Sequence, residues 1–386
     1  MRTLVYANPR TALYPTIAVF ARAGFRVEVV SGNLTNDIPE WVHRFHKIES
    51  LDEGLRVVSR LAETGDYDFL VPVDDICIKQ VREGSWPEWL KPRMLPVISA
   101  EHFSHLASKV GLGFMLRNNG IPTPDFLAVN SPAELFSHAE TFGFPVILKE
   151  DFSFSGAGTF LCRSSQDLAI ALDQLKTFPV LCQRYIDGKL FSVEALYVKG
   201  KLIHFAYSEI LKNFQRKEFS VSCARRYPAA TDYPRDLELW VQKLGAALGV
   251  HGFLNIGGIQ EAASGDLYFF EADARPNAWV LHPSLFGNCF SSALKRFYGT
   301  KNDQAFTVQS GPPQAKVMSI ANRLSGMDFF LNRYAAWECA QLEPNPKNLM
   351  FRRLKYEIAS LIRLRAWRRF RKRPPVAIRR IRGWPS

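Results

Sequence analysis

Two short stretches hold residues that could bind a phosphorylated ligand. In PVILK (145–149) an apolar run ends in Lys149, and the Ser- and Gly-rich stretch SFSGAGTF follows at 153–160. Glycine and serine leave backbone N–H groups open to an anion, and a lysine at a strand end can reach phosphate oxygens. Taken alone, this pattern is also typical of an ordinary β-hairpin.

The stretch FFEADARPN (269–277) favours a binding site over that alternative. Glu271 and Asp273 are two apart on a predicted strand, so both carboxylates face one side, and Arg275 continues that side. Converging carboxylates are costly unless a cation lies between them, and oxygen ligands suit a Mg²⁺ that also holds nucleotide phosphates. Arg275 then suits a charge clamp on the phosphates or on a developing acyl phosphate. A surface strand with paired charges is the alternative, but the neighbouring residues are too apolar for it.

The elements that must position these residues follow an α/β pattern. Strands and helices alternate over the first ~100 residues, which predicts a small parallel sheet, and no GxGxxG motif follows the first strand. Asp74 and Asp75 end its third strand, where they either face a ligand crevice and receive an amine or cap the next helix. Helices are also expected at 101–119, which includes Lys109, and at 319–340.

In this order the motifs resemble those of the ATP-grasp superfamily, over roughly residues 1–300. The matching parts are an N-terminal α/β unit, a helix with Lys109 before GIPTPDF, and the stretches PVILK, SFSGAGTF, PVLCQRYIDG, SVEA and FFEADARPN. The resemblance implies an α/β fold (α+β in the ATP-grasp lobes) that begins with a Rossmann-like pre-ATP-grasp domain. The expected domains are 1–100 (pre-ATP-grasp), 101–300 (two-lobed ATP-grasp, covering lobe about 120–187), 301–350 (C-terminal helical extension) and 351–386 (basic amphipathic helix and tail).

Carried over by position, the resemblance also assigns roles to single residues. Glu271 and Asp273 would hold Mg²⁺, and Lys149 and Arg275 would act in catalysis. Lys109 and Lys149 would bind the nucleotide phosphates under a covering loop at 153–159. The implied nucleotide-binding residues are Lys109, Lys149, Ser153, Ser155, Gly156, Gly158, Gln183, Arg184, Tyr185, Ile186 and Asp187, with the adenine at 183–186.

Three positions depart from the family pattern. Asp273 stands where the family usually has Asn, and Asp is a competent metal ligand. The acid that often holds the ribose is missing from its usual place, and Asp187 is its nearest replacement. On the strand before Glu271, two glycines disturb the register, so Asn255, Gln260 or Glu261 could supply a further metal ligand; we choose Gln260.

The resemblance implies an ATP- and Mg²⁺-dependent ligase, which activates a small-molecule carboxylate as an acyl phosphate for attack by an amine or similar nucleophile. A covering loop suits this chemistry, because an acyl phosphate is short-lived in water. The alternatives are an ATP-grasp kinase for a small molecule and a non-catalytic ATP-binding scaffold tethered by its tail. Basic residues at 208–229 either hold a carboxylate or phosphate of the substrate or form a solvated loop.

Positive charge is concentrated in the tail. Residues 351–386 contain 13 Lys and Arg and one acid, a net charge of +12 that equals that of the whole chain. Apolar residues recur every three or four positions at 351–367, and basic residues fill the other face. This pattern suits an anionic membrane surface, an RNA or an acidic carrier protein, or a terminal helix packed on the body.

Cysteine usage and hydropathy indicate a cytoplasmic protein. The six cysteines are scattered and form no CxxC, as expected in a reducing compartment. No stretch approaches ~18 apolar residues, and the N-terminus lacks the pattern of a signal peptide. The tail could hold the protein at the inner membrane surface, and a homo-oligomer is compatible with the sequence.

Overall fold

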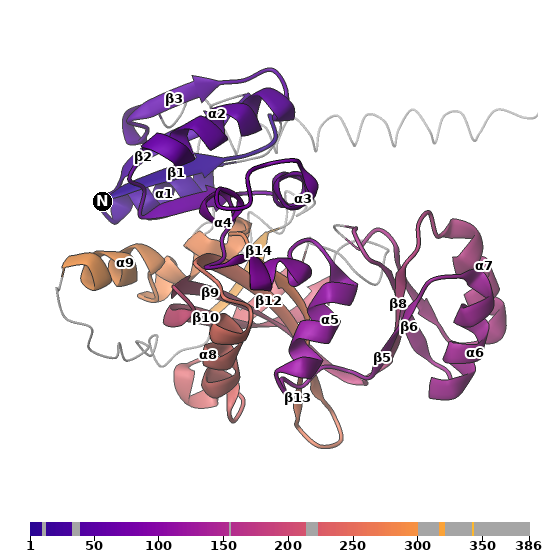
Figure 1. The fold of residues 1–386 in the computed structure, drawn as a ribbon. Helices are drawn as coiled ribbons and strands as arrows, with labels where there is room; N and C mark the ends of the chain where they lie inside the picture. The colour runs from indigo at the N-terminus through magenta and orange to yellow at the C-terminus, as the bar shows by residue number, and fades with distance from the viewer. Residues whose placement is uncertain are drawn as a thin grey trace, which may run out of the picture.

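The computed structural model describes residues 1–9, 13–32, 39–153, 156–213, 223–299, 316–320 and 342. These residues form one parallel and two antiparallel sheets with helices packed on them (Figure 1), so the predicted α/β class is confirmed. None of the helices within these ranges has both the length and the apolar character needed to cross a membrane. The basic tail at 351–386 lies outside the described residues.

The first sheet is parallel and belongs to the N-terminal part of the chain. Its elements are β1 (Arg2–Tyr6), α1 (Tyr14–Arg22), β2 (Arg26–Ser31), β3 (Arg44–Lys47), α2 (Leu51–Thr64), β4 (Phe69–Pro72), α3 (Asp75–Glu83) and α4 (Lys91–Met94). The strand order β3-β2-β1-β4 places β1 and β4 side by side at the point where the chain changes its direction of travel across the sheet. Strand β3 was not expected, because its sequence RFHK has no apolar run. We refer to residues 1–99 as the N-terminal unit.

A second, smaller sheet is antiparallel and has its own hydrophobic core. Its elements are β5 (Phe126–Val129), α6 (Pro132–Phe142), β6 (Val146–Glu150), β7 (Thr159–Cys162), α7 (Ser165–Gln174) and β8 (Val180–Arg184), which we call the small lobe. The serines before the two helices, Ser131 and Ser164, each accept a backbone N–H from three residues on. The buried cluster formed by Val129, Leu148 and Leu168 draws all its members from residues 129–182.

The largest sheet is antiparallel and lies at the centre of the molecule (Figure 1). Its elements are β9 (Gly188–Val198), β10 (Lys201–Asn213), β11 (Cys223–Tyr227), α8 (Leu237–Ala247), β12 (Gly252–Glu261), β13 (Leu267–Asp273), α9 (Phe290–Gly299) and β14 (Lys316–Ile320). The strand order is β13-β12-β9-β10-β11-β14. Strand β14 differs from the helical extension expected at 301–350, because residues 316–320 pair with β11. The remainder of the helix expected at 319–340 lies outside the described residues.

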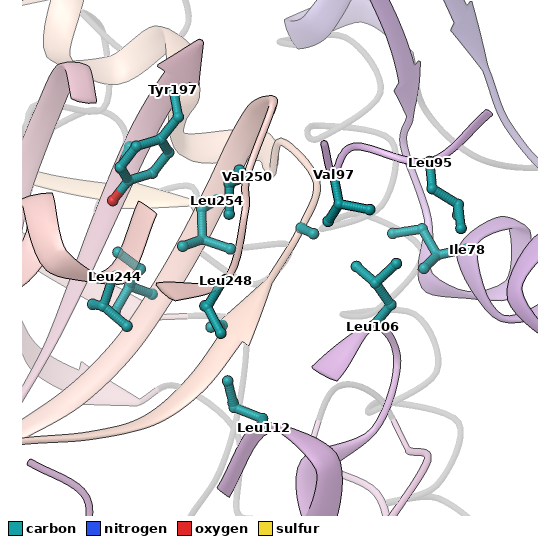
Figure 2. Packing of buried hydrophobic residues seen from close by; sticks show 14 of the residues in the cluster. Ile78, Leu95, Val97, Leu106, Leu112, Tyr197, Leu244, Leu248, Val250 and Leu254 are labelled. Atoms are coloured by element: carbon teal, nitrogen blue, oxygen red, sulfur yellow. The ribbon is translucent and has the colours of Figure 1, made fainter. Parts of the chain in front are cut away.

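One hydrophobic cluster joins the N-terminal unit to the large sheet. Figure 2 shows Ile78, Leu95 and Val97 on one side of this cluster and Leu254 and Tyr197 on the other. All five side chains are at most 3% exposed. The N-terminal unit and the large sheet therefore pack as one body.

Gly245, in the middle of α8, provides a test of this packing. A Cβ atom at this position would overlap with the ring of the buried Tyr197, whose hydroxyl donates to the carbonyl of Val241 at 2.7 Å. An alanine gains about 1 kcal/mol over glycine in an exposed helix, but overpacking a core costs about 1–3 kcal/mol. We expect Gly245→Ala to lower the free energy of unfolding in urea, and Gln242→Ala on the exposed face of α8 to leave it nearly unchanged. A more stable Gly245→Ala protein would contradict the tight contact.

Candidate active site

The helix that carries Lys109 is shorter than expected. The sequence predicted one helix at 101–119, but a 3-10 helix covers Ala100–His105, and α5 spans Lys109–Asn118. Between them Ala107 has a left-handed φ of 51°, which ends the first helix, and Ser108 caps the second. Lys109 therefore lies in the first turn of α5.

The start of α5 is bonded to the start of the covering loop. Asp151 Oδ1 accepts from Ser108 Oγ at 2.8 Å and from the backbone N–H of Val110 at 2.9 Å. Lys109 Nζ donates to the carbonyl and to the hydroxyl oxygen of Ser153, each at 3.0 Å. These contacts bring Lys109 to the start of the covering loop.

Lys149, on β6, is buried where the small lobe meets the large sheet. Its Nζ donates to Gln183 Oε1 at 2.9 Å and lies 4.3 Å from the ring centroid of Phe270. Burial lowers the pKa of Lys149 to about 8; the charge of Glu271 opposes this shift and that of Lys109 adds to it. Because an amide and a ring do not neutralise an ammonium group, an anionic ligand would be its strongest partner.

The covering loop depends on glycine at two positions. Gly156 and Gly158 have φ values of 73° and 67°, which residues with a Cβ atom rarely adopt. A Cβ at Gly158 would also overlap with the carboxylate of Glu150. Ser155 lies outside the described residues.

Glu271 and Asp273 lie on β13 in the predicted two-residue spacing. On the neighbouring strand β12, Gly257 lies opposite Glu271 and Asn255 lies opposite Asp273. The register skips Phe270, which is therefore a β-bulge. Bulges redirect side chains, and here the ring of Phe270 lies against the ammonium group of Lys149. The sequence had shown two glycines at this point but not the aromatic contact.

Asp273 is surrounded by charged groups of both signs. Desolvation raises its pKa, Asp75 and Glu271 raise it further, and Arg275 and Lys109 act in the opposite direction. The net direction is upward, because desolvation and the two neighbouring carboxylates outweigh the attraction of Arg275 and Lys109. A bound cation would favour the ionised form of Asp273.

Arg275 follows β13 and contacts two carboxylates. Its Nε and Nη2 donate to the two oxygens of Asp75 at 2.8 and 2.7 Å, and Nη2 also donates to Asp273 at 2.9 Å. The two acids at the end of β4 therefore have different roles. Asp74 caps α3 by accepting the backbone N–H of Cys77 at 2.9 Å, whereas Asp75 reaches Arg275.

The structure separates Gln260 from the expected metal ligands, which corrects our choice among three candidates. Gln260 lies opposite Leu267, and its side-chain amide donates to the carbonyl of Gly265 at 3.2 Å, at the turn of the hairpin. It is also an odd number of residues from Asn255 on the same strand, so the two side chains face opposite sides of the sheet. Asn255 is the candidate that lies opposite Asp273.

The expected adenine segment connects the small lobe to the large sheet. Gln183 and Ile186 are buried, Arg184 is half-buried, and Tyr185 and Asp187 are exposed. Gln183 accepts the hydrogen bond from Lys149 described above. The exposed side chain of Asp187 leaves its assignment to the ribose a prediction.

A buried polar cluster that lies beside Asp273 was not expected from the sequence. Glu194 on β9 is 1% exposed, and its Oε1 accepts from Arg225 Nη1 at 2.7 Å and from the amides of Asn255 and Asn277 at 3.3 Å each. Arg225 was expected in a substrate loop, but it is a residue of β11. Asn255 lies opposite both Glu194 and Asp273, so a polar row crosses three neighbouring strands. The signal was a glutamate inside the apolar strand sequence SVEALYV.

The charges of this site suit a divalent cation bound to a polyphosphate. Within the described ranges, no cluster of three or more His, Cys, Asp or Glu is suited to hold a metal ion. Glu271 and Asp273 alone would leave most of a Mg²⁺ shell to oxygens of the ligand, as is usual for Mg²⁺ held by phosphates. Lys109 and Lys149 supply positive charge for the same phosphates.

A comparison with known proteins matches the part of the chain that carries Lys149, Glu271, Asp273 and Arg275. A model of the ATP-grasp domain matches residues 114–277. The large chain of carbamoyl phosphate synthase from Streptomyces griseus subsp. griseus is 28% identical over 200 residues, which are 50% of this chain and 18% of that protein. The first curated relatives are matched over only 7% to 18% of their own lengths.

Solved structures share the fold over most of the chain. N5-carboxyaminoimidazole synthetase from Staphylococcus aureus, complexed with ADP, superposes with a TM-score of 0.62 at 15% identity and covers 86% of this chain and 85% of that one. The biotin carboxylase domain of Hydrogenobacter thermophilus 2-oxoglutarate carboxylase, in complex with MgADP, ADP and bicarbonate, gives 0.60 at 16% identity, with 82% and 73% covered. At this level of identity the likeness establishes the fold.

Proposed function

Because the chain contains an ATP-grasp domain, we propose that it is an ATP- and Mg²⁺-dependent ligase that joins a carboxylate to an amine or similar nucleophile through an acyl phosphate. One observation carries this proposal: charged side chains from parts of the chain far apart in sequence lie close enough to shift one another's pKa values. They are Lys109 of α5, Lys149 of β6, Glu271 and Asp273 of β13, and Arg275 just after β13. The structural neighbours that contain ADP or MgADP support the same nucleotide and metal.

Each residue of the site has a task in this reaction. Bound MgATP would supply the phosphoryl group, and Mg²⁺ would disperse phosphate charge. Lys109 and Lys149 would hold phosphate oxygens, and Glu271 and Asp273 would hold Mg²⁺. Arg275 stabilises negative charge while a carboxylate oxygen attacks the γ-phosphorus and ADP leaves; the nucleophile then attacks the acyl carbon and phosphate leaves.

A kinase that phosphorylates a small molecule would use the same residues, and so would a scaffold that binds ATP without turnover. The products separate the three functions. A ligase releases phosphate only when carboxylate and nucleophile are both present, a kinase transfers the phosphate to its substrate, and a scaffold does neither. The anionic membrane surface, RNA or carrier protein expected to bind residues 351–386 remains a prediction, as does a homo-oligomer.

The first test is whether the folded protein binds MgATP. Ligand binding to the folded state raises the melting temperature, by a free energy that grows with ligand concentration over Kd. We expect MgATP and MgADP to raise the melting temperature, and EDTA to reduce the effect because the carboxylates then repel the phosphates. Calorimetry with MgADP should give one site per chain. No response to either nucleotide would contradict the proposal, whereas a response justifies measuring phosphate release with pairs of carboxylates and amines.

A further inference from the structure

One ion pair joins the N-terminal unit to the candidate active site across 200 positions of sequence. Asp75 accepts two hydrogen bonds from Arg275, at 2.8 and 2.7 Å, and the two side chains are 18% and 19% exposed. We infer that Asp75 is a positioning residue that sets the orientation of Arg275 for the reaction. This inference rests on the proposed function.

Asp75 follows a residue that is bonded to two backbone groups of the N-terminal unit. The preceding residue, Asp74, accepts the backbone N–H of Cys77 with one oxygen and that of Asn8 with the other, at 2.9 and 2.8 Å. These bonds tie the start of α3 to the end of β1. Asp75 thus projects from the carboxyl ends of the neighbouring strands β1 and β4, the place in an open α/β sheet where ligands bind.

The packing of the N-terminal unit on the large sheet fixes the distance between the backbones of Asp75 and Arg275. The cluster in Figure 2 is shared by the N-terminal unit and the large sheet, and β13 leads directly to Arg275. A bidentate contact between guanidinium and carboxylate fixes the plane of the guanidinium as well as its position. Asp75 therefore constrains Arg275 more tightly than a single hydrogen bond would.

The geometry also shows what the pair leaves open. Asp75 and Asp273 contact Nε and Nη2, so neither occupies Nη1, and that edge can donate to a ligand anion. Asp75 and Asp273 are the two carboxylates that contact Arg275, so without Asp75 the guanidinium would keep Asp273 alone of this pair. It would then compete with a metal ion for that carboxylate. Asp75 both orients Arg275 and limits this competition.

The test is Asp75→Asn, which keeps the shape of the side chain and removes its charge. We expect kcat for MgATP-dependent phosphate release to fall about 10- to 100-fold, because small misplacements of a catalytic group have effects of this size. The affinity for MgADP should fall much less than kcat does, because the two lysines are untouched and only the competition of Arg275 with the metal ion for Asp273 increases. Asp75→Glu, which keeps the carboxylate, should restore part of the rate.

Glu83→Gln is the matched control, since it removes one negative charge from the exposed end of the same helix. The described contacts of Glu83 are with Lys79 and Arg82, so this variant should keep the wild-type kcat. An equal loss of kcat in Glu83→Gln, or a wild-type kcat in Asp75→Asn, would overturn the inference.

Arg275→Lys provides a second measurement, through a double-mutant cycle with Asp75→Asn. Lysine keeps the charge but cannot form the bidentate contact, so we expect a similar loss of kcat. Adding Asp75→Asn to it should cause little further loss, because the two residues act through one contact. Losses that multiply would show that they act independently and would contradict the inference. If the wild-type protein turns over no MgATP, the proposed function fails and the inference with it; if it does and Asp75→Asn matches it, only the inference fails.

Discussion

Replacing Lys149 with methionine is expected to lower the rate of MgATP-dependent phosphate release by at least about 100-fold, the usual cost of removing a donor from a preorganised site. The ammonium group contacts the uncharged side chains of Gln183 and Phe270, and the charge of Glu271 only partly offsets the cost of its burial. Methionine fills the same space but cannot donate to a phosphate. The stabilisation of the protein by MgATP should also be largely lost.

The same substitution is expected to stabilise the unliganded protein at neutral pH. Desolvation lowers the pKa of Lys149 to about 8 from an ordinary value of 10.5, so the unfolded chain binds more protons between these values. The contribution of Lys149 to stability is therefore unfavourable below about pH 8 and improves as pH rises towards about 10.5. The excess unfolding free energy of Lys149→Met over wild type, measured in urea, should shrink over that range.

Lys189→Met is the control, because Lys189 is exposed at the start of β9. It should change neither turnover nor the pH dependence of stability. Full turnover in Lys149→Met, or a loss of its folded structure, would contradict the assignment of Lys149 to the phosphates.

Neutralising the carboxylates of β13 has the second large expected effect. Asp273→Asn and Glu271→Gln should each reduce turnover by at least about 100-fold, since even outer partners of metal ligands cost 10- to 100-fold. Each should also remove the Mg²⁺-dependent part of the stabilisation by nucleotide. Thermal shift with MgADP, compared with ADP in EDTA, measures this part directly.

Asp273 adds a pH dependence with a definite sign. Desolvation and the charges of Asp75 and Glu271 raise its pKa, so a proton competes with the metal ion at low pH. Affinity for Mg²⁺ should therefore increase with pH until Asp273 is ionised. The stability of the unliganded protein should fall through the same range, because the folded state holds the proton more tightly than the unfolded one. Both trends should disappear in Asp273→Asn.

Glu261→Gln serves as the control on the same hairpin. Glu261 accepts from Ser264 at the turn and was one of the three candidates for a further metal ligand. We expect wild-type Mg²⁺ dependence in this variant. A loss of Mg²⁺ dependence there, with Asp273→Asn unaffected, would move the metal site to the hairpin turn.

The residues that the sequence located best are those whose chemistry depends on local spacing. Glu271 and Asp273 share a side because strands repeat every two residues, and Lys149 ends an apolar run before a glycine-rich turn. The α/β class followed from alternating elements in the same way. The bulge at Phe270 was hinted at only by Gly257 and its neighbouring glycine, because register is set between strands.

The contacts that the sequence could not supply join distant residues. The sequence around Asp75 does not indicate that its side chain contacts Arg275, which lies 200 positions later. Glu194 and Arg225 are in contact because β9, β10 and β11 are neighbours in one sheet. Strand β14 was missed for a related reason, because it forms by pairing with β11, which lies far earlier in the sequence. A single sequence specifies such pairings but does not display them.

The separate core of the small lobe has a consequence for how the whole chain unfolds. Its core cluster draws all its members from the lobe, and the contact of Phe126 with Phe114 of α5 lies outside that cluster. The lobe can therefore lose its structure without disturbing the cluster that unites the N-terminal unit and the large sheet. Lys149 lies on one side of this division and Asp273 on the other. A nucleotide held by both would act as a removable cross-link between two folding units. Cooperative unfolding would then be a property of the complex rather than of the polypeptide alone.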